Sequence, residues 1–225
     1  MKYIDLSHLI EDGMITYQGL PAPLICDYFS RQEASQIYDD GSTFQIGKID
    51  MVGNTGTYMD CPFHRFEEGR DFSELFLKKL VNLPGVIVRC PFEEQLEIGV
   101  GLLHDLDVAG RAVLFQTGWD RHWRTDTYFE GHPFLSTEAA EFLVKKGAVL
   151  AGIDSYNIDD TSLMKRPVHT KLLGADILII EHMCNMHLIP GGIDFTVTAV
   201  PPKIRKVGSF PVRVYASVNE TAINS

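Results

Sequence analysis

The chain has 225 residues, of which 45% are hydrophobic and 22% are charged. This balance excludes a disordered, collagen-like or coiled-coil protein and favours one folded domain, which we expect to span residues 1–225. Thirty Asp and Glu against twenty Lys and Arg give a net charge of −10, which argues against a nucleic-acid partner. No apolar run approaches the ~20 residues of a membrane span, and the four cysteines form no CxxC pair. We therefore expect a cytoplasmic protein that binds neither nucleic acid nor a membrane.

Short apolar runs rich in β-branched residues predict the strands of a sheet. They are residues 86–88, 112–115, 148–153, 176–180 and 212–218. One helix is well marked between Ser136, a good N-cap residue, and Gly147, which suits the left-handed position after a helix. A second, shorter helix is predicted over residues 73–81, and residues 11–24 and 184–202 read as irregular. The pattern predicts a mixed β/α fold of the α/β class.

The densest polar cluster runs from Asn54 to Phe66 and holds Asp60 and His64 on either side of Pro62. Proline fixes the backbone and breaks helices, so the pair is expected on a rigid turn or strand end. An Asp and a His so placed either share a metal or act as an acid/base and its orienting group. The alternative is a surface Asp beside a hydrogen-bonded structural His.

A second cluster combines His169 with Glu181, which directly follows the apolar residues 177–180. A carboxylate at the end of a buried strand needs a partner or a metal, unless the strand simply ends in water. Together with Asp60 these residues supply an acceptable ligand set for Zn²⁺ or Mn²⁺, with His64 nearby.

The usual nucleophile and nucleotide motifs GxSxG, GxxxxGK[ST] and GxGxxG do not occur in the sequence. Cys61 is a poor candidate nucleophile because its neighbour Asp60 disfavours the thiolate. Chemistry is therefore expected at the Asp, His and Glu clusters.

Blocks along nearly the whole chain resemble the cyclase-like metal-dependent hydrolases, a family that includes bacterial kynurenine formamidase and isatin hydrolase. In the family's order they are residues 5–8, 13–14, 17–19, the TGTxxDxPxH of 55–64, 116–120, 152–154, 168–173, 181–185 and 211–213. The resemblance implies a swivelling β/β/α fold and a homo-oligomer, either a dimer or a tetramer. It also implies metal-assisted hydrolysis of a C–N bond in a small formamide or cyclic amide. Its default substrate is N-formylkynurenine, from tryptophan catabolism.

The central block departs from the family pattern HxGTHxDxPxH at two positions, where Asn54 and Tyr58 replace histidines. Those two histidines resemble ligands of the first metal in two-metal members and of the only metal in isatin-type members. An amide oxygen and a neutral phenol are poor ligands, so tight Zn²⁺ binding at that first position is not expected.

The other matching positions are retained. Asp60 matches the bridging carboxylate, and His64 matches the proton-transferring histidine. His169 and Glu181 match ligands of the second metal. The resemblance thus implies one divalent metal, Mn²⁺ or Zn²⁺, held by Asp60, His169 and Glu181, with the carboxylates favouring Mn²⁺ or Mg²⁺ over Zn²⁺.

The leading hypothesis is an amide hydrolase in which the metal polarises the carbonyl and acidifies a water molecule. His64 takes the proton of that water and returns it to the leaving nitrogen. Tyr58 or Asn54 donates a hydrogen bond to the developing oxyanion.

The sequence is also compatible with two metal-free alternatives. One is a metal-free homologue that binds a small carbonyl compound without hydrolysing it. The other is a metal-free enzyme that uses the group formed by Tyr58, Asp60 and His64.

Three further features have a structural and a functional interpretation. His8 braces either the site or a strand end, with the structural role favoured. Arg213 is a candidate partner for Asp154. An aromatic segment walls a substrate pocket or packs within the protein or between subunits, and it contains Trp119, His122, Trp123, Tyr128, Phe129, His132 and Phe134.

Overall fold

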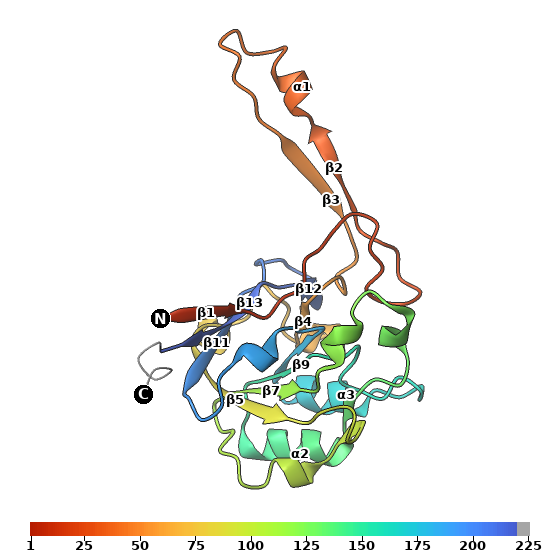
Figure 1. The fold of residues 1–225 in the computed structure, drawn as a ribbon, viewed down its shortest axis with the longest axis vertical. Coiled ribbons are helices and arrows are strands. Elements are labelled where there is room, and N and C mark those ends of the chain that lie inside the picture. Colours follow the sequence, from red (N-terminus) through yellow and green to blue (C-terminus); the bar gives the residue numbers. More distant parts are fainter. Residues whose placement is uncertain (220–225) are drawn as a thin grey trace.

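The computed structural model describes residues 1–219, so residues 220–225 of the expected domain lie outside the described part. A nine-stranded sheet forms the body, in the order β1-β13-β11-β5-β7-β9-β10-β4-β12 (Figure 1). Its strands are β1 (Lys2–Asp5), β4 (Tyr58–Asp60), β5 (Leu83–Arg89), β7 (Ala112–Gln116), β9 (Leu150–Ile153), β10 (Leu178–Glu181), β11 (Phe195–Ala199), β12 (Ser209–Pro211) and β13 (Val214–Val218). Strands outnumber helices, and the predicted mixed α/β class is confirmed.

The remaining elements are short. The helices are α1 (Arg31–Ala34), α2 (Thr137–Lys146) and α3 (Pro167–Gly174). Two strand pairs stand outside the main sheet, β2 (Leu24–Phe29) with β3 (Ile46–Asp50) and β6 (Glu97–Ile98) with β8 (Phe134–Leu135). The 3-10 turns are η1 (Pro62–His64), η2 (Leu77–Lys79), η3 (Val100–Leu102), η4 (Trp119–His122), η5 (Asp126–Phe129) and η6 (Met186–Leu188). Within residues 1–219 no helix has both the length and the apolar character needed to cross a bilayer.

The two faces of the sheet bury different sets of apolar side chains. Strands β5, β7, β9 and β10 run parallel at its centre. Because side chains alternate along a strand, Val113 and Phe115 pack with α2 and α3. Leu114 points the other way, into a core shared with β11 and β13. Strands buried on both faces explain why the central segments read as nearly continuous apolar runs.

Helix α2 begins and ends where local sequence chemistry predicts. The Ser136 side chain accepts a hydrogen bond from the amide of Ala139, and Gly147 adopts the left-handed conformation with φ of 76°. The helix predicted over residues 73–81 is wrong, because only the 3-10 turn η2 forms there. Phe76 and Leu77 are 53% and 66% exposed, so this segment has no continuous apolar face to bury.

Helix α3 was not predicted from the sequence. Pro167 occupies its first turn, where a missing amide donor does no harm. The carboxylate of Asp159 accepts the next two amides, those of Val168 and His169, at 2.8 and 3.0 Å. These bonds satisfy two of the donors that a helix start leaves unpaired, and they fix His169 at a defined position.

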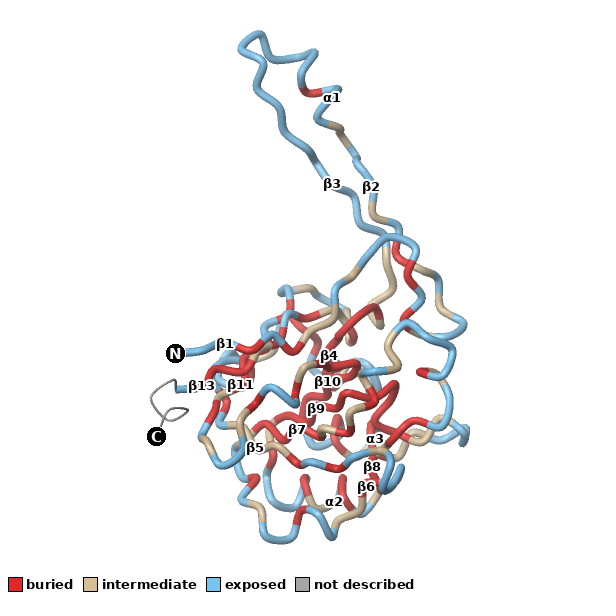
Figure 2. Tube along the Cα trace, in the orientation of Figure 1, coloured by how far each residue is buried: buried red, intermediate tan, exposed pale blue. Residues whose placement is uncertain are grey.

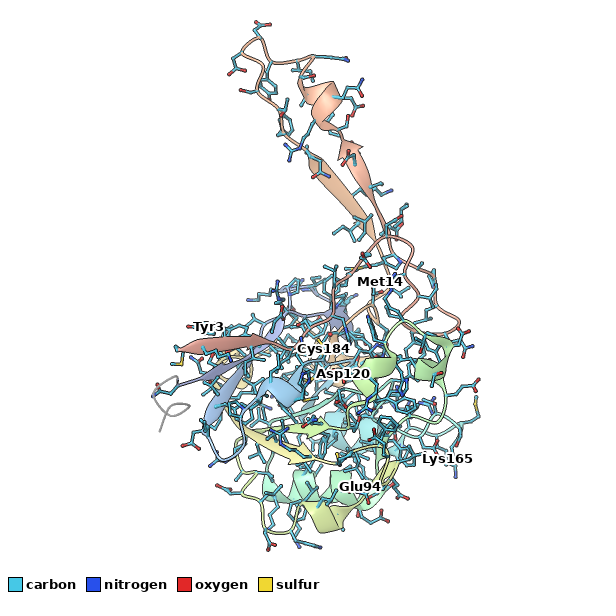
Figure 3. The ribbon with its side chains drawn as sticks, viewed as in Figure 1. Tyr3, Met14, Glu94, Asp120, Lys165 and Cys184 are labelled. Atoms are coloured by element: carbon cyan, nitrogen blue, oxygen red, sulfur yellow. The ribbon has the colours of Figure 1, made fainter. Side chains whose placement is uncertain are left out.

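A long arm made of residues 24–50 projects from the body (Figures 1 and 2). Strands β2 and β3 pair only with each other, and each of their residues is exposed or half-buried. Ser30 and Glu33 cap the short helix α1 reciprocally, and Phe44 contacts both Phe29 and Tyr38 near the tip. The side chains of the arm extend into solvent on both sides (Figure 3). The strand predictions did not include this arm, nor β11 within the supposedly irregular residues 184–202.

Candidate active site

The floor of the site is formed by one face of the antiparallel pair β4 and β10. Glu181 lies directly opposite Tyr58, and Ile179 opposite Asp60, so these four side chains share a face. Met59, the residue between Tyr58 and Asp60, points to the opposite side and joins the apolar core. The strand alternation thus places three polar groups together on the side of the sheet that carries α3.

A cavity of about 230 Å³ opens over this face. Its lining includes all six residues that the sequence reading singled out, namely Asn54, Tyr58, Asp60, His64, His169 and Glu181. Five further residues, none of which was predicted as a site residue, complete it: Tyr17, Leu20, Arg65, Asn157 and Arg166. Three stretches of the chain, within residues 17–20, 54–65 and 157–181, therefore meet at one cavity.

His169 is oriented by Asp159, whose Oδ2 lies 2.6 Å from Nδ1 of the imidazole. The opposite nitrogen, Nε2, lies 3.4 Å from Asp60 Oδ2 and 3.6 Å from Glu181 Oε1. Burial by itself lowers the pKa of His169, but the carboxylates of Glu181, Asp159 and Asp60 outweigh it and raise this pKa to about 10. The Nε2 position between two carboxylates therefore attracts positive charge.

Glu181 is fully buried and has a hydrogen-bond donor at each oxygen. The amide of Ile158 donates to Oε1 at 2.6 Å, and the hydroxyl of Tyr58 donates to Oε2. Burial, followed by the charges of Glu181 and Asp60, raises the pKa of Tyr58 well above its usual value. A hydrogen bond with Asn54 acts in the opposite direction and lowers this pKa. Asn54, Tyr58 and Glu181 thus lie next to one another in the lining of the cavity.

His64 is coupled to Asp60 through a serine that the sequence reading missed. Ser209 on β12 lies opposite Asp60, and its hydroxyl donates to Asp60 Oδ1. The same hydroxyl lies 2.7 Å from Nδ1 of His64. A hydroxyl has one proton and an ionised carboxylate only accepts, so we assign Nδ1 of His64 as the donor to Ser209. This assignment leaves Nε2 of His64 as a proton acceptor.

The donor set is suited to a divalent cation. Asp60 Oδ2 is buried and accepts no hydrogen bond among the described residues. Apart from its 3.4 Å approach to His169 Nε2, this oxygen is therefore incompletely satisfied, which is unfavourable for a buried carboxylate. Ligand atoms of Asp60, His64 and His169 lie within 4.8 Å of one another. Glu181 does not belong to this group, although its Oε1 lies 3.6 Å from His169 Nε2. Imidazole nitrogens and carboxylate oxygens, the ligand types gathered here, are those that Zn²⁺ and Mn²⁺ bind in proteins.

The aromatic segment packs inside the protein rather than lining this cavity. Trp119 and Tyr128 form a buried cluster with Tyr156, and none of the three belongs to the cavity lining. His8 stacks on Trp123 with ring centroids 3.9 Å apart, which agrees with the structural role favoured for it.

Arg213, Asp154 and Cys61 do not take part in the site. Asp154 is not the partner of Arg213, which instead donates to Asp5 at 2.6 Å. Asp154 accepts the amides of Thr117 and Gly118 at 2.9 and 2.8 Å. The Cys61 thiol is an unsuitable nucleophile, since burial raises its pKa to about 12.

The fold and the sequence place the chain in a known family. The model of the family described as "Putative cyclase" matches residues 4–160, and the chain belongs to this family. It is 29% identical over 213 residues to kynurenine formamidase of Geobacillus thermodenitrificans, covering 94% of this chain and 95% of the relative.

Solved structures agree with this placement. A potential metal-dependent hydrolase with cyclase activity superposes with a TM-score of 0.78 at 26% identity, over 97% of this chain and 98% of the other. Isatin hydrolase A from Labrenzia aggregata, bound to benzyl benzoate, has a TM-score of 0.81 at 20% identity, over 97% and 94% of the two chains. The predicted resemblance to the cyclase-like hydrolases is confirmed.

Proposed function

We propose that the protein hydrolyses the C–N bond of a small formamide or cyclic amide. Family membership and the likeness to a kynurenine formamidase support the reaction class. The observation that carries the proposal is the convergence of the His64–Ser209–Asp60 chain with His169 and Glu181 in one cavity. Such a cavity offers a proton acceptor beside a charge-stabilised centre, which is what amide hydrolysis requires.

His64 is proposed as the general base and then the general acid. Its side chain is 36% exposed, so water and substrate reach it, whereas His169 is almost completely buried. With Nδ1 bonded to Ser209, Nε2 accepts a proton from water and returns it to the leaving nitrogen. Ser209 and Asp60 hold the ring in the orientation and tautomer that this role needs.

Asp60, His169 and Glu181 are proposed to hold one divalent metal, Mn²⁺ or Zn²⁺. When bound, such an ion polarises the substrate carbonyl and acidifies water. Asp159 fixes the His169 tautomer by bonding Nδ1, which leaves Nε2 as the ligand atom. Metal-binding histidines commonly have such a carboxylate on the nitrogen that does not bind the metal. Ile158 and Tyr58 position the Glu181 carboxylate in the same way.

Asn54 rather than Tyr58 is proposed to stabilise the oxyanion. The only hydroxyl proton of Tyr58 is engaged by Glu181, so it is not available to substrate. The amide of Asn54 has two N–H donors, of which its hydrogen bond with Tyr58 occupies at most one, and its side chain lines the cavity. The second N–H is the donor proposed for the developing negative charge.

A metal-free protein that binds a carbonyl compound without cleaving it is the second candidate. The observation favouring it is that Tyr58 occupies a position where the family has a histidine ligand and already satisfies Glu181. Both candidates bind a small molecule in the same cavity, so binding alone does not separate them.

Release of formate separates the two candidates. Purified protein supplied with Mn²⁺ or Zn²⁺ is incubated with N-formylkynurenine, and formate is measured with time. Hydrolysis that His64→Ala lowers by about a hundredfold or more, with the metal content retained, supports the proposed chemistry. Saturable binding without formate release supports the second candidate instead.

We further propose that the arm of residues 24–50 packs against another copy of the chain to give a homodimer or tetramer. An isolated two-stranded sheet is marginally stable in water, and this one exposes Leu24, Tyr28 and Ile49 by 49%, 74% and 60%. Ile25 and Ile49 are directly paired, so changing both to Lys places two charges on one face. The double variant is expected to elute as a monomer in light-scattering chromatography, while Leu96→Lys on the body keeps the native mass. A monomeric native protein would contradict this proposal.

A further inference from the structure

Two guanidinium groups line the cavity without an ionic partner. Arg65 follows His64 at the end of η1, and Arg166 precedes Pro167 at the start of α3. Neither has a carboxylate within 4.0 Å in the part of the chain that the structure describes. Of the eight other arginines, five each form such a pair: Arg70, Arg111, Arg121, Arg124 and Arg213. In a chain with ten more acidic than basic residues, two unpaired arginines at one cavity call for an anion.

Arg166 is held rigidly but keeps donors to spare. One nitrogen, Nη1, donates only to backbone carbonyl oxygens, those of Asp160, Leu163 and Lys165, at 3.4, 2.7 and 2.8 Å. The hydroxyl of Tyr17, which also lines the cavity, is a further hydrogen-bond partner of the guanidinium. A guanidinium has five N–H donors in a fixed fork, so this anchoring leaves donors available toward the cavity.

The Asp160 carboxylate does not neutralise Arg166. The side-chain hydrogen bond from Ser162 is the main cause that lowers the pKa of Asp160. The carboxylate accepts the amide of Ser162 at 2.9 Å, and the contact of Arg166 is with the backbone oxygen of Asp160.

Arg65 is positioned by a single contact, from its Nε to Thr170 Oγ1 at 3.1 Å. Thr170 follows His169 on α3, so this bond joins the two segments that carry the imidazoles of the site. The two terminal nitrogens of Arg65 have no acceptor among the described residues.

We propose that the substrate carries a carboxylate, which Arg166 and Arg65 bind while its amide lies over Asp60 and His64. This inference rests on the proposed amide hydrolysis and names the class of substrate. Arginine binds carboxylates through paired N–H donors, and both guanidinium groups line the same cavity as Asp60 and His64. The two arginines therefore orient the substrate by holding its anionic end. The cavity of about 230 Å³ is below the usual size of drug-binding pockets, so the substrate is small.

The test compares two substrates that differ only by the anion, 2-formamidobenzoate and neutral formanilide. The native protein is expected to have a kcat/KM at least tenfold higher for the acid, mainly through a lower KM. Arg166→Gln and Arg65→Gln are each expected to reduce this preference at least tenfold. Lys165→Gln is the matched control, because Lys165 neighbours Arg166 in sequence but lies at the outer edge of the body (Figure 3) and does not line the cavity. The control should keep the preference.

The kcat/KM values for the two substrates decide whether the arginines bind the anion. Equal kcat/KM for both substrates, or a preference that both arginine variants retain, overturns the inference and leaves the proposed hydrolysis intact. If the native protein cleaves neither compound and also releases no formate from N-formylkynurenine, the proposed hydrolysis fails, and titration calorimetry with benzoate then tests the anion site alone. Benzoate binding weakened at least tenfold in Arg65→Gln and Arg166→Gln, but not in Lys165→Gln, supports the site. Binding that is absent or unaffected by these changes refutes it. Arg65→Gln keeps the test valid if Arg166→Gln does not fold.

Discussion

Replacing Ser209 by Ala removes the hydroxyl that connects His64 to Asp60. The hydroxyl donates to Asp60 Oδ1 and lies 2.7 Å from His64 Nδ1. Without it, the nearest approach of His64 Nδ1 to Asp60 is 3.7 Å, which is beyond hydrogen-bond distance. The histidine then loses the contact that fixes both its orientation and its tautomer.

The size of the effect follows from the bonds that are lost. A hydrogen bond to a charged group contributes about 1.5–3 kcal/mol, and each ~1.4 kcal/mol changes a rate tenfold. Ser209→Ala is therefore expected to reduce kcat by roughly 10- to 100-fold, with little change in KM, because Ser209 positions the base and does not line the cavity.

Steady-state hydrolysis of an N-formyl arylamine measures this loss. Ser217→Ala is a matched control, since Ser217 on β13 is as buried as Ser209, both being 8% exposed, and lies on a different part of the sheet. The control should keep the native kcat. If Ser209→Ala also keeps kcat within twofold, while its thermal stability shows that it is folded, the relay from Asp60 to His64 is refuted.

Two further predictions concern stability. Tyr58→Phe removes the phenol that donates to buried Glu181 and should lower the free energy of unfolding in urea by about 1–3 kcal/mol; an unchanged value would show that Glu181 does not need this donor. Burial lowers the pKa of His8 to about 4, against ~6.5 in the unfolded chain. Between these two pH values the unfolded state binds more protons than the folded state. The free energy of unfolding therefore falls as the pH drops from ~6.5 towards about 4. From pH 7.5 to 5 the native protein should lose about 2 kcal/mol more than His8→Phe, which retains an aromatic ring over Trp123; equal losses in urea titrations would contradict the assigned shift.

Local chemistry explains which parts of the fold were predictable. The limits of α2 follow from Ser136 and Gly147, whose effects act within one helical turn. The strands of the sheet centre were visible because both faces are buried. The helix expected over residues 73–81 does not form because the segment has no continuous apolar face to bury. Helix α3 had a readable signal in Pro167, which is frequent in the first turn of helices.

The site was only partly predictable for a physical reason. Asp60, His64, His169 and Glu181 are chemistry-bearing residues that a sequence motif can single out. The groups that orient them come from elsewhere in the chain, and Ser209 reaches Asp60 only through the register of β12 on β4. No local pattern marks such a serine, since its role depends on sheet pairing between segments about 150 residues apart.

The proposed chemistry depends on one divalent metal held by Asp60, His169 and Glu181. The most direct test measures metal content and formate release on the same samples of native protein and Asp60→Asn, both purified with Mn²⁺ and Zn²⁺ available. We predict about one metal per native chain together with turnover, and loss of both in Asp60→Asn. Turnover by native protein freed of metal, or an Asp60→Asn variant that keeps its metal and its full rate, would contradict the claim.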